Sequence, residues 1–244
     1  MKAMIFAAGP GTRLKPLTDT RPKALVAIKG KPMLEHLLLK LKKAGFDEIV
    51  INIHHFGDQI IDFLKANNDF GLNIHISDEQ EYLLDTGGGL KHAALFLRGN
   101  EPFLVHNVDI LSDVDLAAFC RSHRQDTLAT LLVSERPTSR HLLFDSNNRL
   151  LGWSNHATGE IKSFFPDFAS RPYRAYAFGG IHVVSPTLFD RMEEWTGKFS
   201  IIDFYIAACV KDVIAAYPAE GVALYDAGKY ESLETTLRQL TFIQ

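Results

Sequence analysis

The sequence predicts an α/β protein with a doubly wound, mostly parallel sheet. Short apolar segments alternate with helical patterns up to about residue 135, which is typical of strand–helix–strand units with right-handed crossovers. The 244 residues, 46% hydrophobic and 23% charged, are enough for one domain with a large core. No apolar run of about 18 residues is present in the sequence, so we expect no membrane-spanning helix and no membrane partner.

Strands and helices alternate in the first part of the chain. Strands are expected at 4–6, 49–53, 72–76, 103–106 and 128–133. Helices are expected at 33–44, 58–66, 91–97 and 114–124. The first of these helices starts after Pro32 and ends at Gly45, which are the residues that favour a helix start and a helix stop. Lys40, Lys42 and Lys43 are expected on its solvated face.

The pattern changes at residue 136. Two short apolar segments flank the turn at 145–148, which predicts a hairpin inside a small, partly antiparallel lobe at 136–175. A strand with a glycine pair is expected at 176–184. The remaining expected elements are helices at 186–195 and 201–216, a strand at 222–225 and a helix at 230–240.

Positive charge is concentrated near the N-terminus. Residues 1–43 hold ten lysines and arginines but only two acidic residues, although the whole chain has a net charge of −3. A local basic segment on an acidic body favours a small anionic ligand. A duplex-binding protein would have a whole basic face, so we expect no nucleic-acid partner.

The two cysteines, Cys120 and Cys209, are far apart and lie in apolar helical contexts. We interpret them as reduced thiols, because neither a disulfide framework nor a metal-binding spacing is present. Met1 leads straight into the first strand, without the pattern of a signal peptide. The expected location is the cytoplasm.

A loop with two glycines and several cations follows the first strand. Gly9 and Gly11 allow backbone N–H groups to approach an anion, and Arg13 and Lys23 supply charge that a polyphosphate needs. The spacing excludes a Walker loop, which needs Gly-Lys-Ser/Thr before a helix, and Leu14 excludes the dinucleotide fingerprint. The loop therefore predicts a nucleoside triphosphate site, with a merely flexible charged loop as the alternative.

Two further segments carry polar groups. The loop Asp85-Thr86-Gly87-Gly88-Gly89 precedes an expected helix, and from its residues alone it is either a ligand contact or a helix cap. Asp109 follows the strand at 103–106, and the carboxyl ends of strands face the crevice in which open α/β sheets bind ligands. Ser112 and Asp113 can cap the next helix, which leaves Asp109 available for another role.

The basic loop resembles a known motif. Ala7–Leu14, with Pro16-Leu17-Thr18 and Arg21–Val26 after it, resembles the N-terminal motif of sugar-1-phosphate nucleotidyltransferases. The resemblance implies a Rossmann-like fold with an acceptor lobe. It also implies that a nucleoside triphosphate and a sugar 1-phosphate react with release of pyrophosphate. The 85–89 segment resembles the branch that includes N-acetylmuramic acid 1-phosphate uridylyltransferases.

The resemblance implies roles for individual residues. Arg13 would stabilise the departing pyrophosphate and Lys23 the α-phosphate, while Asp109 and Asp226 would hold Mg²⁺. The implied nucleotide contacts are Ala8, Gly9, Gly11, Thr12, Arg13, Lys23, Thr86, Gly87 and Gly88. The implied sugar contacts are Asn107 and Gly180.

The resemblance is incomplete at four positions. Val108 and Lys229 stand where the family usually has glycine and threonine. Glu160 and Lys162 are the nearest match to a family motif that grips the sugar phosphate, and the sequence assigns them no role.

The implied organisation is a single domain. Residues 1–135 would bind the nucleotide, 136–225 the acceptor, and 226–244 would supply the second metal ligand and a last helix. UTP is favoured because a turn of bare glycines suits a pyrimidine edge, and N-acetylmuramic acid 1-phosphate is favoured as acceptor. The alternatives are GTP with mannose or heptose 1-phosphate, CTP with phosphocholine, and a non-catalytic regulatory module. A monomer or weak homo-oligomer is expected.

Overall fold

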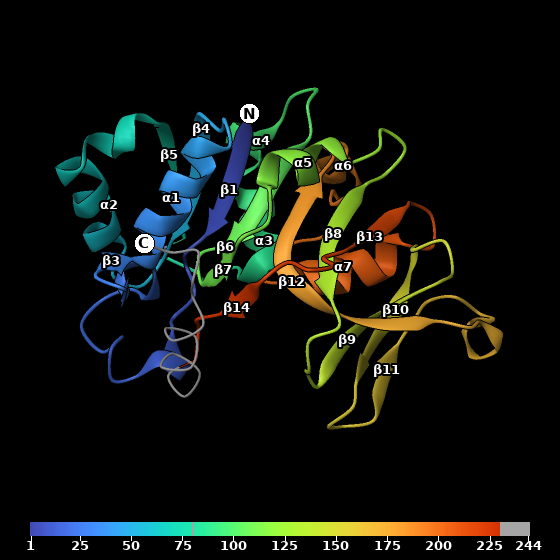
Figure 1. Ribbon diagram of the computed structural model, residues 1–244. Helices are drawn as coiled ribbons and strands as arrows, with labels where there is room; N and C mark the ends of the chain where they lie inside the picture. The colour runs from blue at the N-terminus through green and yellow to red at the C-terminus, as the bar shows by residue number, and fades with distance from the viewer. Residues whose placement is uncertain (80, 230–244) are drawn as a thin grey trace.

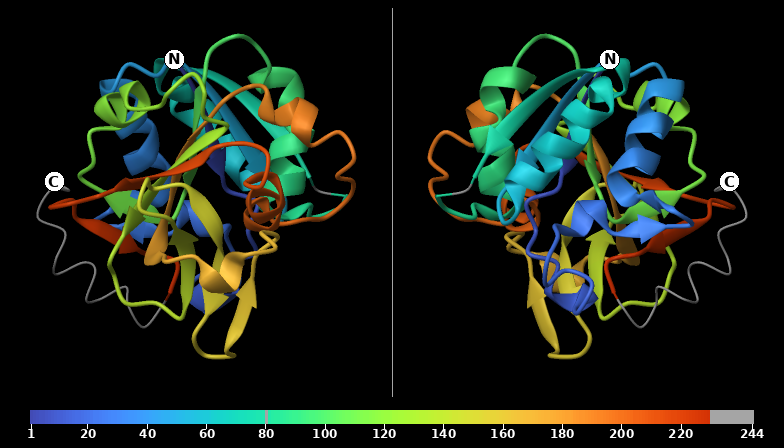
Figure 2. Two further views of the ribbon diagram at one scale, coloured as in Figure 1. Left: turned by 90° about the vertical axis from the view of Figure 1, so that its right-hand side faces the viewer. Right: turned by 90° about the vertical axis from the view of Figure 1, so that its left-hand side faces the viewer.

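The computed structural model describes residues 1–79 and 81–229, and it confirms the α/β fold. A ten-stranded sheet runs in the order β11-β10-β9-β12-β6-β1-β4-β5, and β8 and β13 extend it beside β12. Helices cover both faces of this sheet (Figure 1, Figure 2). The helix expected at 230–240 lies outside the described residues.

Four parallel strands form the half of the sheet that carries the glycine loop. They are β6 (Phe103–Asn107), β1 (Lys2–Phe6), β4 (Glu48–Ile53) and β5 (Asn73–Asp78). Ile5 of β1 lies between Ile51 of β4 and His106 of β6. The carboxyl ends of β1, β4 and β6 therefore meet at one edge of the sheet, where the expected site residues follow the strands.

The other half of the sheet is built around β12 (Arg174–Val184). Antiparallel pairs join β12 to β6, to β8 (Ala129–Ser134) and to β9 (Arg140–Phe144), while β13 (Ile214–Pro218) runs parallel to β8. Strands β9, β10 (Leu150–Asn155) and β11 (Glu160–Lys162) form an antiparallel extension. This extension confirms the expected hairpin and projects away from α1 and α2 (Figure 1).

Side chains that alternate along the strands feed two apolar clusters, one on each face. Ala3 and Ile5 of β1 point into the cluster under α1, α2 and α5, whereas Met4 and Phe6 point into the cluster under α3, α4, α6 and α7. The α-helices are α1 (Met33–Lys43), α2 (Gly57–Ala66), α3 (Asp85–His92), α4 (Ala94–Leu97), α5 (Leu116–Arg121), α6 (Leu188–Arg191) and α7 (Ile201–Ala208). Short 3₁₀ turns cover Thr12–Leu14, Lys23–Leu25, Asn68–Gly71 and Phe168–Ser170.

Two small sheets lie outside the main one. Strand β7 (Ile110–Ser112) pairs antiparallel with β14 (Leu224–Asp226), and β2 (Ala27–Ile28) pairs with β3 (Lys31–Pro32). The first pair matters for the site, because it places Asp226 opposite Ile110, the neighbour of Asp109.

The structure corrects two secondary-structure expectations. The helix expected at 201–216 ends at Ala208, and residues 214–218 form β13 because Ile214 and Ala216 enter the apolar cluster beside β8. The loop expected at 85–89 is instead helical, since α3 starts at Asp85 and contains all three glycines. Tertiary packing outweighs the low helix propensity of glycine at this point.

Two smaller observations complete the fold. Cys120 and Cys209 are both free, as predicted, and burial raises the pKa values of their thiols to about 11 and about 12. Across residues 1–79 and 81–229, none of the helices has the length and apolar character needed to cross a membrane.

Candidate active site

The glycine loop is held in shape by a side chain from within it. Gly11 adopts a left-handed conformation with φ 64°, and a Cβ at this position would lie 2.9 Å from the methyl group of Thr18. The hydroxyl of Thr18 donates a hydrogen bond of 2.9 Å to the carbonyl of Gly11. The turn therefore needs glycine at position 11, both for its φ and for its close packing.

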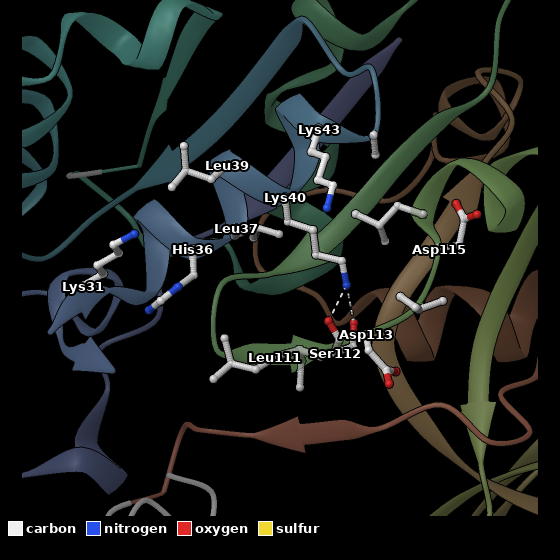
Figure 3. A pocket seen from close by; sticks show the side chains of 14 residues that line it. Lys31, His36, Leu37, Leu39, Lys40, Lys43, Leu111, Ser112, Asp113 and Asp115 are labelled. Carbon is white, nitrogen blue, oxygen red and sulfur yellow. Dashed lines mark hydrogen bonds between the residues drawn. The ribbon is translucent and has the colours of Figure 1, made fainter. Parts of the chain in front are cut away.

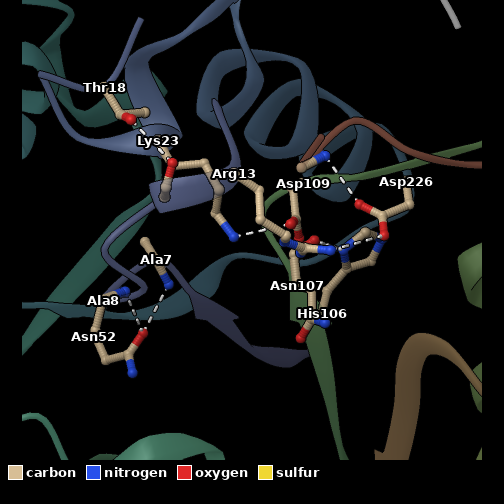
Figure 4. Close-up of polar contacts among 12 residues, drawn as sticks. Ala7, Ala8, Arg13, Thr18, Lys23, Asn52, His106, Asn107, Asp109 and Asp226 are labelled. Atoms are coloured by element: carbon tan, nitrogen blue, oxygen red, sulfur yellow. Dashed lines mark hydrogen bonds and ion pairs between the residues drawn. The ribbon is translucent and has the colours of Figure 1, made fainter. Parts of the chain in front are cut away.

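Asn52 anchors the start of the loop, and the sequence analysis missed it. Its Oδ1 accepts hydrogen bonds from the amides of Ala7 and Ala8 at 2.7 and 3.3 Å (Figure 4), and its Nδ2 donates to Oε1 of Glu79 at 2.7 Å. Both side chains are buried. The amide of Ala8 is thus occupied by the protein, so a nucleotide contact at Ala8 would have to use another atom.

Lys23 and Asp109 form the central ion pair of the site. Their Nζ and Oδ2 atoms are 2.8 Å apart, and the two side chains are only 14% and 7% exposed. Asp109 is fixed by its backbone, since its carbonyl accepts a hydrogen bond from the amide of Ala227 at 2.9 Å. Residues 86 positions apart in the sequence therefore meet at the edge of the sheet, as the resemblance implied.

Arg13 and Asp226 form a looser second pair beside the first. Nη1 of Arg13 lies 4.0 Å from Oδ2 of Asp226, and Figure 4 shows the guanidinium reaching from the loop toward this carboxylate. The amide of Gly228 donates to Oδ1 of Asp226 at 2.9 Å. All four residues with implied phosphate or metal roles thus lie in one region.

The two aspartates fit a magnesium ion. A Cβ added at Gly228 would collide with Oδ2 of Asp109 and lie 2.9 Å from Oδ1 of Asp226, so both carboxylates approach one point that only glycine leaves open. Among the residues that the structure describes, no group of three or more His, Cys, Asp or Glu could hold a metal. Two carboxylates completed by phosphate oxygens and water are a usual Mg²⁺ arrangement.

Val108 and Lys229, the two departures from the family pattern, do not obstruct this arrangement. Val108 is fully buried in the apolar cluster under α1, and its amide donates to the carbonyl of Phe6. Its side chain therefore packs in the core. Lys229 is exposed and lines the larger of the two cavities described next.

A cavity of about 340 Å³ lies over the glycine loop. Its walls are Phe6, Ala8, Gly9, Pro10, Arg13, Lys23, Asn52, Glu79, Leu83, Asp85, Thr86, Asn107, Asp109 and Lys198. Most of the expected nucleotide contacts are therefore brought together. Thr86 belongs to this wall, and its Oγ1 also accepts a hydrogen bond from the amide of Ile201.

Gly87 and Gly88 have a packing role in α3, and their contact with the nucleotide stays a prediction. Their amides donate to the carbonyl of Phe199 at 2.9 and 3.2 Å, so they are not bare donors for a base. A Cβ at Gly87 would collide with the Phe199 ring, and one at Gly88 would lie 2.5 Å from the carbonyl of Gly197. These glycines let α3 pack closely against the segment before α7.

A second cavity of about 870 Å³ adjoins the first, with Phe6, Arg13, Asp85, Thr86 and Asn107 in both walls. Its other walls come from the β8–β9 loop, from β9 to β12 and from α7. Gly180 has φ 72°, and a Cβ there would lie 2.9 Å from Nδ2 of Asn107. The two expected sugar contacts are therefore neighbours, and Asn107 stands where the two cavities meet.

A buried neutral histidine lies in the wall of the larger cavity. His182 lines it, and the Nδ1 of His182 lies 2.8 Å from the hydroxyl of the buried Tyr205. Burial lowers the pKa of His182 to about 3, and the proximity of His106 acts in the same direction. Burial also lowers the pKa of His106 to about 3. Both imidazoles are neutral at physiological pH.

These histidines predict an acid-sensitive fold. In the unfolded chain His182 takes up a proton near its ordinary pKa of 6.5, whereas the folded chain holds it neutral down to about pH 3. As the pH falls from 6.5 to about 3, the free energy of unfolding should therefore decrease by about 1.4 kcal/mol per pH unit for each such histidine. We expect His182→Phe to reduce this slope by the contribution of one proton, about 1.4 kcal/mol per pH unit. Urea unfolding between pH 7 and pH 4.5 measures the slope in both proteins. Equal slopes in the two proteins would contradict the assignment.

A third cavity, of about 620 Å³, lies between α1 and β7 (Figure 3). Lys40 was expected on a solvated face, which is wrong: its Nζ donates to the carbonyl and hydroxyl of Ser112 at 2.5 and 2.9 Å. Burial lowers the pKa of Lys40 to about 8, although Asp113 and Asp115 oppose this shift. Lys40 thus ties α1 to the end of β7, the strand that follows Asp109.

Comparisons with known proteins agree with this geometry. The chain matches the family model described as "Nucleotidyl transferase" over residues 2–241. It is 39% identical over 197 residues to N-acetylmuramate alpha-1-phosphate uridylyltransferase of Neisseria meningitidis serogroup B, which is 79% of each protein. It is 48% identical over 109 residues to the protein of the same name from Caulobacter vibrioides, which is 44% of this chain and 45% of that protein.

The fold also has solved counterparts. The crystal structure of HddC from Yersinia pseudotuberculosis, complexed with GMP-PN, superposes with a TM-score of 0.78. The match covers 98% of this chain and 99% of that one at 22% sequence identity, and it concerns the fold alone.

Proposed function

Because this chain belongs to the nucleotidyl transferase family, we propose that it joins a nucleoside triphosphate to a sugar 1-phosphate and releases pyrophosphate. One observation carries the proposal. Lys23, Arg13, Asp109 and Asp226 converge beside the glycine loop, at the junction of a smaller and a larger cavity. Such a junction suits a reaction between a nucleotide in one cavity and a sugar phosphate in the other.

The reaction is an in-line displacement at phosphorus. An oxygen of the sugar 1-phosphate forms a bond to the α-phosphorus while the bond from that phosphorus to the bridging oxygen of the β-phosphate breaks. Pyrophosphate leaves with the bonding electrons. The attacking phosphate is already an anion, so no proton needs to be removed, and catalysis depends on positioning and charge neutralisation.

The residues of the site divide these tasks. The 9–12 backbone would hold the triphosphate, Arg13 the departing pyrophosphate and Lys23 the α-phosphate. Asp109 and Asp226 would hold Mg²⁺, which when bound supplies positive charge to the phosphate oxygens. Lys23 already neutralises Asp109, so this carboxylate is placed and compensated before any ligand arrives.

The acceptor phosphate has a candidate partner in Lys162. Its ammonium lies 3.4 Å from Asp203 and 5.3 Å from the centre of the Trp153 ring, and all three side chains line the larger cavity. These two contacts hold the Lys162 side chain in place, so that its ammonium can face a phosphate in the cavity. Asn107 and Gly180, which are neighbours, would contact the sugar.

We propose UTP and N-acetylmuramic acid 1-phosphate as the substrate pair, and hence a role in cell-wall recycling. The support is the similarity to the Neisseria and Caulobacter proteins, whose names describe this activity. The argument from bare glycines no longer supports a pyrimidine, because the amides of Gly87 and Gly88 are paired. A cytoplasmic location and a monomer or weak homo-oligomer stay predictions.

The substrate pair has a direct test. With each nucleoside triphosphate in turn and either N-acetylmuramic acid or mannose 1-phosphate, we expect pyrophosphate release to favour UTP with the muramic acceptor. A preference of about tenfold in kcat/KM corresponds to about 1.4 kcal/mol of barrier. If GTP with mannose 1-phosphate is the better pair, the chain is a guanylyltransferase and the proposed substrate pair is wrong. No turnover with any pair would favour a non-catalytic module.

A further inference from the structure

Several buried polar atoms without partners lie in the segment from the end of β8 to β10. Among residues 1–79 and 81–229, Nε of Arg136, Nδ1 of His141 and the hydroxyls of Ser134 and Ser154 are buried and have no hydrogen-bond partner. Buried polar atoms in proteins are nearly always paired, so such a cluster calls for water or a ligand. All four residues belong to the region from the end of β8 to β10.

The fold brings two of these residues into the cavity wall. Arg136 and His141 both line the cavity, and His141 is directly opposite Ser154 on the neighbouring strand. Nη2 of Arg136 donates to the carbonyl of Phe178 at 3.2 Å, which fixes the guanidinium against β12. Arg136 therefore presents a held cation and not a freely moving one.

Charge in this cavity is unevenly compensated. Lys162 has Asp203 at 3.4 Å and Arg13 has Asp226 at 4.0 Å. Arg136 and Arg140 make no ion pair with any described residue. The acceptor's phosphate must lie near Asp109 and Asp226, where the α-phosphate is attacked. The positive charge on the β8–β9 side is therefore left for a second negative group.

We propose that Arg136 is a specificity-determining residue that binds the carboxylate of an acidic sugar 1-phosphate, with His141 beside it. This inference rests on the proposed function and concerns the same site. A guanidinium is a planar fork that matches a carboxylate, and a half-buried one binds it more strongly than a solvated one. In N-acetylmuramic acid 1-phosphate the lactyl ether supplies this carboxylate.

The test compares two acceptors that differ only in this group. N-acetylmuramic acid 1-phosphate and N-acetylglucosamine 1-phosphate share the ring and the phosphate, but only the first has the lactyl carboxylate. We expect Arg136→Gln to lower kcat/KM for the acidic acceptor about 10- to 100-fold, mainly through KM, because a hydrogen bond to a charged group is lost. The value for the neutral acceptor should stay within about threefold, because the variant keeps all the phosphate contacts.

Two further variants make the result specific. Arg136→Lys keeps the charge without the fork and should retain part of the preference. Arg140→Gln removes an exposed arginine from the same wall and should change kcat/KM by the same factor for both acceptors. Melting temperatures of all variants would show whether each one folds.

Different failures point to different errors. If Arg136→Gln lowers kcat/KM equally for both acceptors, Arg136 holds the phosphate and the carboxylate subsite is wrong. The subsite is also wrong if Arg136→Gln changes kcat/KM for neither acceptor. It is wrong too if only Arg140→Gln removes the preference for the acidic acceptor. If the wild-type chain releases pyrophosphate with no sugar 1-phosphate, the proposed function itself fails, and the subsite fails with it.

Discussion

Replacing Asp109 or Asp226 with Asn is expected to lower kcat by about 10³-fold in each case. A metal held by carboxylates contributes several kcal/mol to a charged transition state, and an amide oxygen carries no charge to hold it. The two carboxylates approach one point at Gly228, so neither can replace the other. Pyrophosphate release at increasing Mg²⁺ concentration measures the effect, and Mg²⁺ binding by calorimetry in the presence of nucleotide measures it without turnover.

A matched control separates loss of the metal from loss of the fold. Asp126 is an exposed aspartate that pairs with Arg124 outside the cavities, and Asp126→Asn should retain wild-type turnover and Mg²⁺ binding. Asp226→Asn should keep a melting temperature near that of the wild type when nucleotide and metal are absent, whereas Asp109→Asn leaves the Lys23 ammonium without its anion and should melt at a lower temperature. Wild-type Mg²⁺ dependence in either site variant would remove that residue from the metal site.

Much of the site could be predicted because its signals are local. The glycine loop, Lys23 and Asp109 each follow a strand or belong to a contiguous motif, and parallel strands bring their carboxyl ends together whatever the sequence between them. Asp226 was predicted only through the resemblance. Its position depends on the pairing of β14 with β7, which joins segments more than 110 residues apart.

The sequence analysis missed residues whose role depends on packing. Asn52 lies in an apolar strand, and a polar residue inside a buried run is a signal that could have been noticed. Arg136 had no such signal, because its importance comes from burial against β12. The same limit explains α3: three successive glycines favour a loop by propensity, and only the approach of Phe199, Gly197 and Glu79 makes them necessary in a helix.

Lys23→Met is expected to lower kcat by about 10³-fold while the KM for the triphosphate changes much less. The ammonium lies 2.8 Å from Oδ2 of Asp109, and it would lie 3.6 Å from a Cβ built at Gly9. The ammonium therefore lies between the proposed metal site and the glycine loop. Its charge would act most strongly on the α-phosphate as that group gains charge during attack. The expected loss is therefore in turnover and not in binding.

A second effect of the same substitution must be separated from the first. Removing Lys23 leaves the buried carboxylate of Asp109 without its cation, which in general costs about 3–5 kcal/mol of stability. The double variant Lys23→Met/Asp109→Asn removes both charges and should recover the melting temperature but not the turnover. Lys23→Arg should also stay impaired, because the Lys23 side chain is only 14% exposed and a wider head has little room. If Lys23→Met keeps kcat within about threefold of the wild type, the lysine serves the stability of the loop and the transition-state role is wrong.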